Sequence, residues 1–266
     1  MELGLDERVC VVTGASSGIG AATALLLAAE GASLVLVGRR HEPLADVAHA
    51  CNARGAPTVS VIALDITVPE APQQIVDAAA EGLGRLDVLI NNAGTSSAVP
   101  IEQLTEEDWQ LQWELNVLAP MRLMRACAPL MADAGWGRIV NVCSSSGKRP
   151  GQRNVAYSVT KAAELSLSRA FADAYSKSGV LVNAVTPGPV GTELWLGPGG
   201  LADQVAAAQG ATREQVLERT ASGVPLGRFG TAEEIANVIV FLCSEAASNV
   251  AGAAWSVDGG AVPVII

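Results

Sequence analysis

The sequence predicts an α/β fold built on one parallel sheet of about seven strands with helices on both faces. Short apolar runs alternate with helical patterns along the whole chain. These runs are continuous rather than alternating, which is typical of strands buried on both faces. Repeated strand–helix units with right-handed crossovers give a doubly wound sheet. No linker or compositional break divides the 266 residues, so we expect a single domain over residues 1–266.

Seven runs rich in Val, Leu, Ile and Ala have the length of strands. In chain order they are Val9–Val12, Ser33–Val37, Val59–Ala63, Leu86–Ile90, Arg138–Cys143, Val180–Val185 and Ala254–Val257. Helical spacing fills the gaps between them. The predicted helices cover Gly18–Glu30, Glu42–Arg54, Pro69–Gly82, Thr105–Met131, Ala156–Ser178 and the stretch from Thr231 to Ser244.

Turn and capping residues support four of these boundaries. The first helix opens from a glycine-rich turn directly after the first strand. Thr105 stands where a helix N-cap is needed, with Asp108 three residues on. Gly179 follows the long helix that begins at Ala156, as glycine does at helix carboxyl ends. Thr231 caps the last helix in the same way as Thr105.

One segment, Gly191–Arg228, breaks the strand–helix rhythm. It contains helical patterns over Leu201–Gln209 and Arg213–Ser222. A long insertion after the carboxyl end of a strand is a common position for a substrate lid. Its apolar side chains suit an acyl chain or ring, but they would equally pack the lid onto the domain; they are Leu194, Trp195, Leu196 and Leu201.

The charge balance and the cysteine pattern exclude several classes of function. The net charge of −10 argues against a nucleic acid or an anionic membrane as partner. The five cysteines are scattered without a CxxC pair, and the two histidines fall on one predicted helix, so we expect reduced thiols and no metal site. No apolar run reaches the ~18 residues of a membrane span, and residues 1–8 lack the pattern of a secretory signal. We therefore expect a cytoplasmic protein.

The glycine-rich turn Thr13–Gly20 indicates a dinucleotide site. Gly14 permits the tight turn, Gly18 lets the backbone approach a pyrophosphate, and Gly20 allows close helix packing. The amino end of the following helix then faces the anion. This strand–turn–helix context predicts a Rossmann-type fold.

The end of the second predicted strand favours NADP(H) over NAD(H). NAD-dependent enzymes usually place a carboxylate there to bind the ribose hydroxyls. This chain has Gly38 followed by Arg39 and Arg40. A guanidinium pairs with the 2′-phosphate of NADP, whereas a carboxylate repels it. The alternative is that the two arginines belong to a solvated loop.

A Tyr-x-x-x-Lys spacing supplies the candidate chemistry. Tyr157 and Lys161 share a helix face, because positions i and i+4 are neighbours on a helix. An ordinary tyrosine titrates near ~10, and an adjacent ammonium favours its ionised form. Ser144 stands thirteen residues upstream and could bind a substrate oxygen.

Taken together, these motifs resemble the short-chain dehydrogenase/reductase family over essentially the whole chain. The matching segments are TGASSGIG at Thr13–Gly20, Asp65 in LDIT, NNAG at Asn91–Gly94, Asn116 in ELNVLAP, Ser144 in NVCSSSG, YSVTK at Tyr157–Lys161, NAVTPGPVGT at Asn183–Thr192, and the tail Pro225–Gly260.

The resemblance implies a role for each matching residue. Tyr157 would protonate the carbonyl oxygen as hydride arrives, with Ser144 hydrogen-bonded to the same oxygen. Lys161 would favour the Tyr157 phenolate and bind the nicotinamide ribose, and Asn116 would bend its helix and hold a water that relays protons to Lys161. The cofactor-binding set would be Gly14, Ser16, Ser17, Gly18, Ile19, Gly20, Arg39, Arg40, Asp65, Ile66, Asn92, Ala93, Gly94, Tyr157, Lys161, Pro187, Gly188, Val190 and Thr192. The substrate set would be Ser144, Ser146, Arg153, Tyr157, Pro189 and Trp195.

Within the family, the chain resembles bacterial 3-oxoacyl-acyl-carrier-protein reductases, which implies reduction of a 3-oxoacyl thioester carried by acyl carrier protein or CoA. Two departures weigh against the carrier, because Ser178 and Gly135 stand where such reductases tend to have basic residues. Basic patches elsewhere could still dock it; they contain Arg122, Arg125, Lys148, Arg149 and Arg153. The alternatives are an NAD(H)-linked dehydrogenase of a sugar, steroid or other secondary alcohol, and a cofactor-binding scaffold without turnover.

The family usually forms tetramers, so the resemblance also implies a homotetramer. The helices over Thr105–Met131 and Ala156–Ser178 carry many small residues suited to one interface. The apolar run Ala261–Ile266 would be exposed in a monomer and suits the other.

Overall fold

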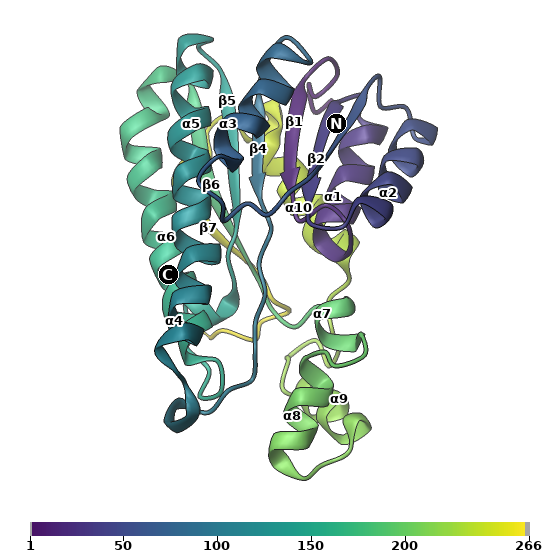
Figure 1. Ribbon diagram of the computed structural model, residues 1–266, viewed down its shortest axis with the longest axis vertical. Coiled ribbons are helices and arrows are strands. Elements are labelled where there is room, and N and C mark those ends of the chain that lie inside the picture. Colours follow the sequence, from purple (N-terminus) through teal and green to yellow (C-terminus); the bar gives the residue numbers. More distant parts are fainter. Residues whose placement is uncertain (1, 264–266) are drawn as a thin grey trace.

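A computed structural model describes residues 2–263 and contains one seven-stranded parallel sheet (Figure 1). Its strands are β1 (Val9–Thr13), β2 (Ser33–Gly38), β3 (Val59–Ala63), β4 (Val88–Asn91), β5 (Gly137–Val142), β6 (Val180–Pro187) and β7 (Ala254–Val257). Their order across the sheet is β3-β2-β1-β4-β5-β6-β7. The predicted fold class, a Rossmann-type doubly wound sheet with helices on both faces, is confirmed.

The sheet order reverses between β1 and β4, and this position locates the site. Cys10 pairs with Leu34 of β2 on one side and with Val88 of β4 on the other. The chain therefore leaves β1 toward one edge of the sheet and returns at β4 toward the other. The carboxyl ends of strands diverge at such a switch point, and this opens a crevice for ligands.

Two helical layers cover the sheet. One contains α1 (Gly18–Ala29), α2 (His41–Ala53) and α10 (Ala232–Cys243), and the other contains α3 (Ala71–Val76), α4 (Glu106–Trp113), α5 (Ala119–Asp133) and α6 (Val155–Tyr175) (Figure 1). Successive side chains of a strand point to opposite faces. Val12 and Leu34 accordingly join the core beneath α1, whereas Val11 and Val35 join the core beneath α5.

The helix predicted over Thr105–Met131 is interrupted. It consists of α4, a π-helical segment at Glu114–Leu118, and α5. The helix predicted over Pro69–Gly82 is also interrupted. It consists of α3, which begins at Ala71, and a π-helical segment at Asp77–Glu81. A π-turn adds one residue to a helical turn, and such turns are frequent at functional sites.

The segment predicted as a lid stands apart from the sheet, below it in Figure 1. Its helices α8 (Leu201–Gln209) and α9 (Arg213–Ser222) have the predicted bounds, and a short helix α7 (Glu193–Leu196) precedes them. No helix within residues 2–263 is both long enough and apolar enough to cross a membrane. Of the predicted apolar tail, residues 264–266 lie outside the described part of the chain.

Candidate active site

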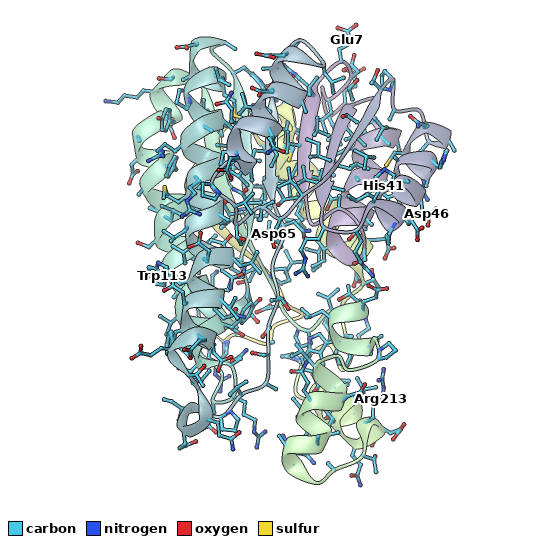
Figure 2. All side chains as sticks on the ribbon, viewed as in Figure 1. Glu7, His41, Asp46, Asp65, Trp113 and Arg213 are labelled. Carbon is cyan, nitrogen blue, oxygen red and sulfur yellow. The ribbon has the colours of Figure 1, made fainter. Side chains whose placement is uncertain are left out.

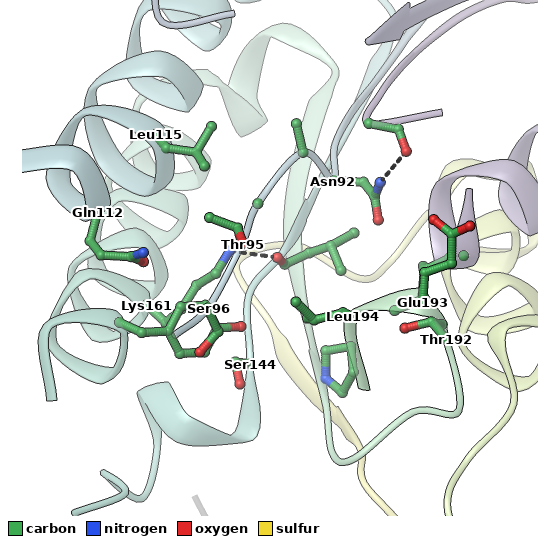
Figure 3. A pocket seen from close by; sticks show the side chains of 18 of the residues that line it. Asn92, Thr95, Ser96, Gln112, Leu115, Ser144, Lys161, Thr192, Glu193 and Leu194 are labelled. Atoms are coloured by element: carbon green, nitrogen blue, oxygen red, sulfur yellow. Dashed lines mark hydrogen bonds between the residues drawn. The ribbon is translucent and has the colours of Figure 1, made fainter. Parts of the chain in front are cut away.

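A cleft of about 840 Å³ lies at the carboxyl ends of the strands, between the sheet and the lid. Figure 3 shows that Gln112 and Lys161 lie on one side of it, with Thr192 and Leu194 on the other. Figure 2 shows Asp65 near the middle of the molecule and Arg213 on the lid. One cavity thus extends from the glycine-rich turn to the predicted catalytic side chains.

The glycine-rich turn needs its glycines for two different reasons. Gly14 and Gly18 have φ of +64° and +54°, which side chains rarely adopt. A Cβ on Gly20 would lie 2.3 Å from the carbonyl oxygen of Gly14, so this glycine allows the helix to approach the turn. Asn92 Nδ2 donates to the carbonyl oxygens of Thr13 at 2.9 Å and Gly14 at 3.2 Å. The turn is thereby fixed to the end of β4.

This cradle fits the phosphates of a dinucleotide. Ser17, the N-cap of α1, makes no side-chain capping bond, so no hydroxyl covers the amino end of the helix. Ser16, Ser17, Gly18 and Ile19 all line the cleft. Backbone N–H groups at a helix amino end bind anions.

The far end of the cleft carries the adenosine-side candidates. Arg39 and Arg40 are exposed and line the cleft together with Asp65 and Ile66. Hydrogen bonds from the backbone N–H and hydroxyl of Thr67 lower the pKa of Asp65, against a smaller opposing effect of burial, with a further lowering from Arg39. Asp65 is therefore a fixed carboxylate at this end.

Tyr157, Lys161 and Ser144 meet at the other end. Tyr157 and Lys161 lie on α6, and Lys161 Nζ is 5.8 Å from the centroid of the Tyr157 ring. Ser144 follows β5 and is nearly buried, and its hydroxyl accepts a hydrogen bond of 3.1 Å from the backbone N–H of Ser146. All three side chains face the cleft, so one carbonyl oxygen could contact both hydroxyls.

The sequence analysis missed the closest partner of Lys161. Its Nζ donates to Glu164 Oε2 at 2.7 Å and to the carbonyl oxygen of Val142 at 2.9 Å. Burial is the largest single effect and would lower the pKa of Lys161, but the Glu164 carboxylate, Tyr157 and Cys143 together raise the pKa above its ordinary value. Burial also raises the pKa of Glu164, against the opposite effect of Lys161.

Asn116 lies behind the cleft, within the π-helical segment. Its Nδ2 donates to Gln112 Oε1 at 2.8 Å and to Thr160 Oγ1 at 3.1 Å, which ties the segment to α6. Its Oδ1 is buried and has no hydrogen-bond partner. A Cβ built on Gly94 would lie 3.4 Å from this oxygen and 3.7 Å from Lys161 Nζ. The amide oxygen and the ammonium therefore both lie beside Gly94.

The structure brings most of the predicted residues into the cleft, and besides Asn116 only two of them do not line it. The cleft is lined by Asn92, Ala93, Gly94, Ser146, Pro187, Gly188, Pro189, Val190, Thr192 and Trp195. Gly20 lies beneath the turn as a packing residue. Arg153 does not reach the cleft; it is exposed in the loop before α6 and lines a separate hollow with Ile101 and Glu102.

Several polar cleft residues carry no motif that could have identified them. Ser96 follows β4, Gln112 comes from α4, and Asn154 precedes α6. Asn154 Nδ2 donates to Ser146 Oγ at 3.3 Å, so it belongs to the same polar wall. Only their convergence in the fold reveals them.

Comparison with known proteins agrees with this geometry. A family model described as "Enoyl-(Acyl carrier protein) reductase" matches residues 14–262. The chain is 39% identical over 255 residues to cis-4-hydroxycyclohexanecarboxylate dehydrogenase of Sinomonas cyclohexanicum, and the match covers 96% of each chain. It is 34% identical over 261 residues to the 3-oxoacyl-acyl-carrier-protein reductase FabG of Thermotoga maritima, and this match covers 97% of this chain and 99% of the relative.

A solved structure gives the same result. L-sorbose reductase from Gluconobacter frateurii, complexed with NADPH and L-sorbose, superposes with a TM-score of 0.92. The match covers 100% of both chains at 36% identity. These relatives are reductases or dehydrogenases, and they differ in the substrates for which they are named.

Proposed function

This chain belongs to the short-chain dehydrogenase/reductase family, and we propose that it is an NADP(H)-dependent oxidoreductase that interconverts a ketone and a secondary alcohol. The observation that carries the proposal is the convergence of Ser144, Tyr157 and Lys161 in one cleft with the glycine-rich cradle. A scaffold without turnover would have no need of this arrangement.

The roles follow from the chemistry of each side chain. A bound nicotinamide nucleotide supplies or accepts the hydride. Tyr157 donates its phenolic proton to the carbonyl oxygen, and the Ser144 hydroxyl donates a hydrogen bond to the charge that develops there. Lys161 supplies the positive charge beside the phenolate, and its remaining N–H is available to the nicotinamide ribose.

The preference for NADP(H) rests on the loop after β2. Gly38 leaves the position of the usual carboxylate empty, and Arg39 and Arg40 line the cleft nearby. Two guanidinium groups favour a 2′-phosphate. NAD(H) remains the second choice, because Glu193 lies 3.6 Å from Arg40 and offsets part of its charge.

For the substrate, we propose a ketone on an apolar chain or ring. A 3-oxoacyl thioester is the first candidate. Leu194, Trp195 and Leu201 line the lid side of the cleft and suit an acyl chain. We infer that residues 191–228 act as the lid that shields the reacting carbonyl from water.

A sugar-derived ketone or polyol is the second candidate, and one observation favours it. Ser96, Ser146 and Asn154 form a polar wall next to Ser144 and Tyr157. Hydroxyl and amide side chains at that position would bind substrate hydroxyl groups. The likeness to an L-sorbose reductase gives this candidate further support.

We expect a free thioester to be reduced nearly as well as one carried by acyl carrier protein. Two of the basic residues that could dock the carrier are already engaged. Lys148 Nζ donates to the carbonyl oxygen of Ala254 at 2.7 Å and to Ser256 Oγ at 3.0 Å. Arg122 pairs with Glu114 and donates to the carbonyl oxygen of Thr67.

The proposal can be tested by assaying a panel of ketones, first with NADPH and then with NADH. Turnover is measured as oxidation of the nucleotide. The panel should include 3-oxoacyl thioesters of CoA and of carrier protein, cyclic ketones and ketoses. The proposal expects NADPH-linked turnover of at least one ketone, with free and carrier-bound thioesters reduced alike if thioesters are substrates. Turnover of ketoses alone selects the second candidate, and the absence of turnover across the panel rejects the proposed substrate classes.

A further inference from the structure

Glu164 is a fully buried carboxylate in contact with the lysine of the active site. It lies one helical turn after Lys161 on α6, and the two side chains are 1% and 3% exposed. Their contact of 2.7 Å is that of an ammonium with a carboxylate. Because both groups are almost entirely removed from solvent, each depends on the other to remain charged.

The contact also restricts what Lys161 can do. An ammonium has three N–H donors. Two of them are used by Glu164 and by the carbonyl oxygen of Val142. One donor is left for the Tyr157 side of the cleft, so the lysine is held in position before any ligand binds.

The net charge of the Lys161–Glu164 pair affects how readily Tyr157 loses its proton. Beside an isolated ammonium, ionisation of a tyrosine neutralises a buried charge and is strongly favoured. Beside an ammonium that already has a carboxylate, the same ionisation places two anions around one cation. Glu164 therefore weakens the effect by which Lys161 draws the proton from Tyr157.

We propose that Glu164 is the counter-charge of Lys161 and that it opposes the ionisation of Tyr157 by Lys161, which keeps the phenolic proton available for ketone reduction. The proposal rests on the proposed function, since it concerns the same site. In that direction the carbonyl carbon gains a hydride from the reduced nicotinamide, and the carbonyl oxygen takes the Tyr157 proton with the electron pair of the C=O π bond. Solvent returns a proton to the phenolate, so charge and atoms balance. Glu164 acts through Lys161 and is a positioning residue.

Few other titratable groups surround this pair. Tyr157 is on the same helix, and the Cys143 thiol faces Glu164 from the end of β5. Burial keeps Cys143 neutral by raising its pKa well above the usual range. The next cation is Lys148, which slightly lowers the pKa of Cys143. Its ammonium donates hydrogen bonds to the carbonyl oxygen of Ala254 and to Ser256 Oγ. The charge that Tyr157 meets is therefore mainly that of Lys161 and Glu164.

The chain permits a direct test because it has only two tyrosines, Tyr157 and Tyr175. In a Tyr175→Phe background, the phenolate absorbance of the protein without cofactor or substrate reports on Tyr157 alone. Glu164→Gln should move the midpoint of this titration down by about one pH unit or more, the size of effect expected of a neighbouring charge. Glu164→Asp, which keeps the charge but withdraws it from Lys161, should lie between Glu164→Gln and the parent.

Glu30→Gln is the matched control, since it removes an exposed carboxylate at the far end of α1 and should leave the midpoint unchanged. As a second readout, the alkaline limb of the pH–kcat profile for ketone reduction should move down by the same amount in Glu164→Gln. Identical titrations for the parent, the Gln variant and the Asp variant would overturn the proposal and leave Glu164 a structural counter-ion. If the Gln variant does not fold, the Asp variant decides between these outcomes. Because the titration uses no substrate, it does not depend on whether the proposed function is correct.

Discussion

Arg40 and Glu193 form an ion pair of 3.6 Å that joins the loop after β2 to the first helix of the lid. Both side chains are largely exposed, so the pair contributes little to stability. The pair matters for cofactor binding, because Glu193 offsets part of the charge of one of the two arginines that line the cleft. Within residues 2–263, Arg39 forms no such pair and is the freer cation for a 2′-phosphate.

The first prediction concerns cofactor choice. Replacing Gly38 by Asp and Arg39 by Gln should lower kcat/KM for NADPH at least about tenfold and raise it for NADH, because the change adds repulsion and deletes a charged hydrogen bond. The nearest neighbour of a Cβ at Gly38 would be the Leu44 side chain at 3.4 Å, which is an ordinary contact distance. Arg40→Gln alone should have a smaller effect, and Arg54→Gln, at the other end of α2, should have none. Equal use of both nucleotides by the unmodified enzyme would contradict the assignment.

The second prediction concerns the lid. Trp195 packs edge-to-face on Phe229 with the ring centroids 5.4 Å apart, and it lines the cleft. Trp195→Ala should reduce kcat/KM more for long acyl substrates than for short ones, by about 0.8 kcal/mol for each buried methylene. Leu196→Ala is the control, because Leu196 belongs to the same helix but does not line the cleft. A uniform loss across chain lengths would show that Trp195 only packs the lid.

The third prediction concerns assembly. Leu130 on α5 and Val159 on α6 are 40% and 43% exposed, which leaves apolar side chains on the outer face of this layer. We predict a homotetramer of dihedral symmetry. Light scattering at micromolar concentration should give the mass of four chains, and Val159→Glu should reduce it. Leu196→Glu, on the lid, should not. A monomer mass for the unmodified protein would refute the prediction.

The fourth prediction concerns the thiols. Burial raises the pKa of Cys51 to about 11 and that of Cys127 and Cys243 to about 12. Cys10 and Cys143 are also buried, and their pKa values are raised well above the usual range, chiefly by burial. A thiol reagent at neutral pH should therefore modify none of the five in the native protein and all five after unfolding. Rapid labelling of the native protein would indicate an opening of the core.

Much of the fold could be predicted because its signals are local. Apolar runs predicted the strands to within about two residues, and the bounds of α8 and α9 were predicted as they stand. The π-helical segment around Asn116 was not predictable by spacing, because one extra residue in a turn leaves the apolar pattern readable as a continuous helix.

The site was predictable where motifs define it and not where the fold alone does. Gly14, Tyr157 and Lys161 belong to sequence motifs, and all three line the cleft. Glu164 looks in the sequence like a solvated carboxylate at i+3 from a lysine, and only the packing of α6 against β5 shows that it is buried. Arg153 was assigned to the substrate from sequence, but the path of its loop leads it away from the cleft.

The most direct test of the central claim is the turnover of Tyr157→Phe with NADPH and the best ketone of the panel. Tyr175→Phe is the matched control, because Tyr175 stacks on Phe171 at the far end of the same helix. The account predicts that Tyr157→Phe lowers kcat at least about 100-fold, as expected for a lost general acid, while NADPH binding stays nearly unchanged. Near-normal turnover by Tyr157→Phe would contradict the account.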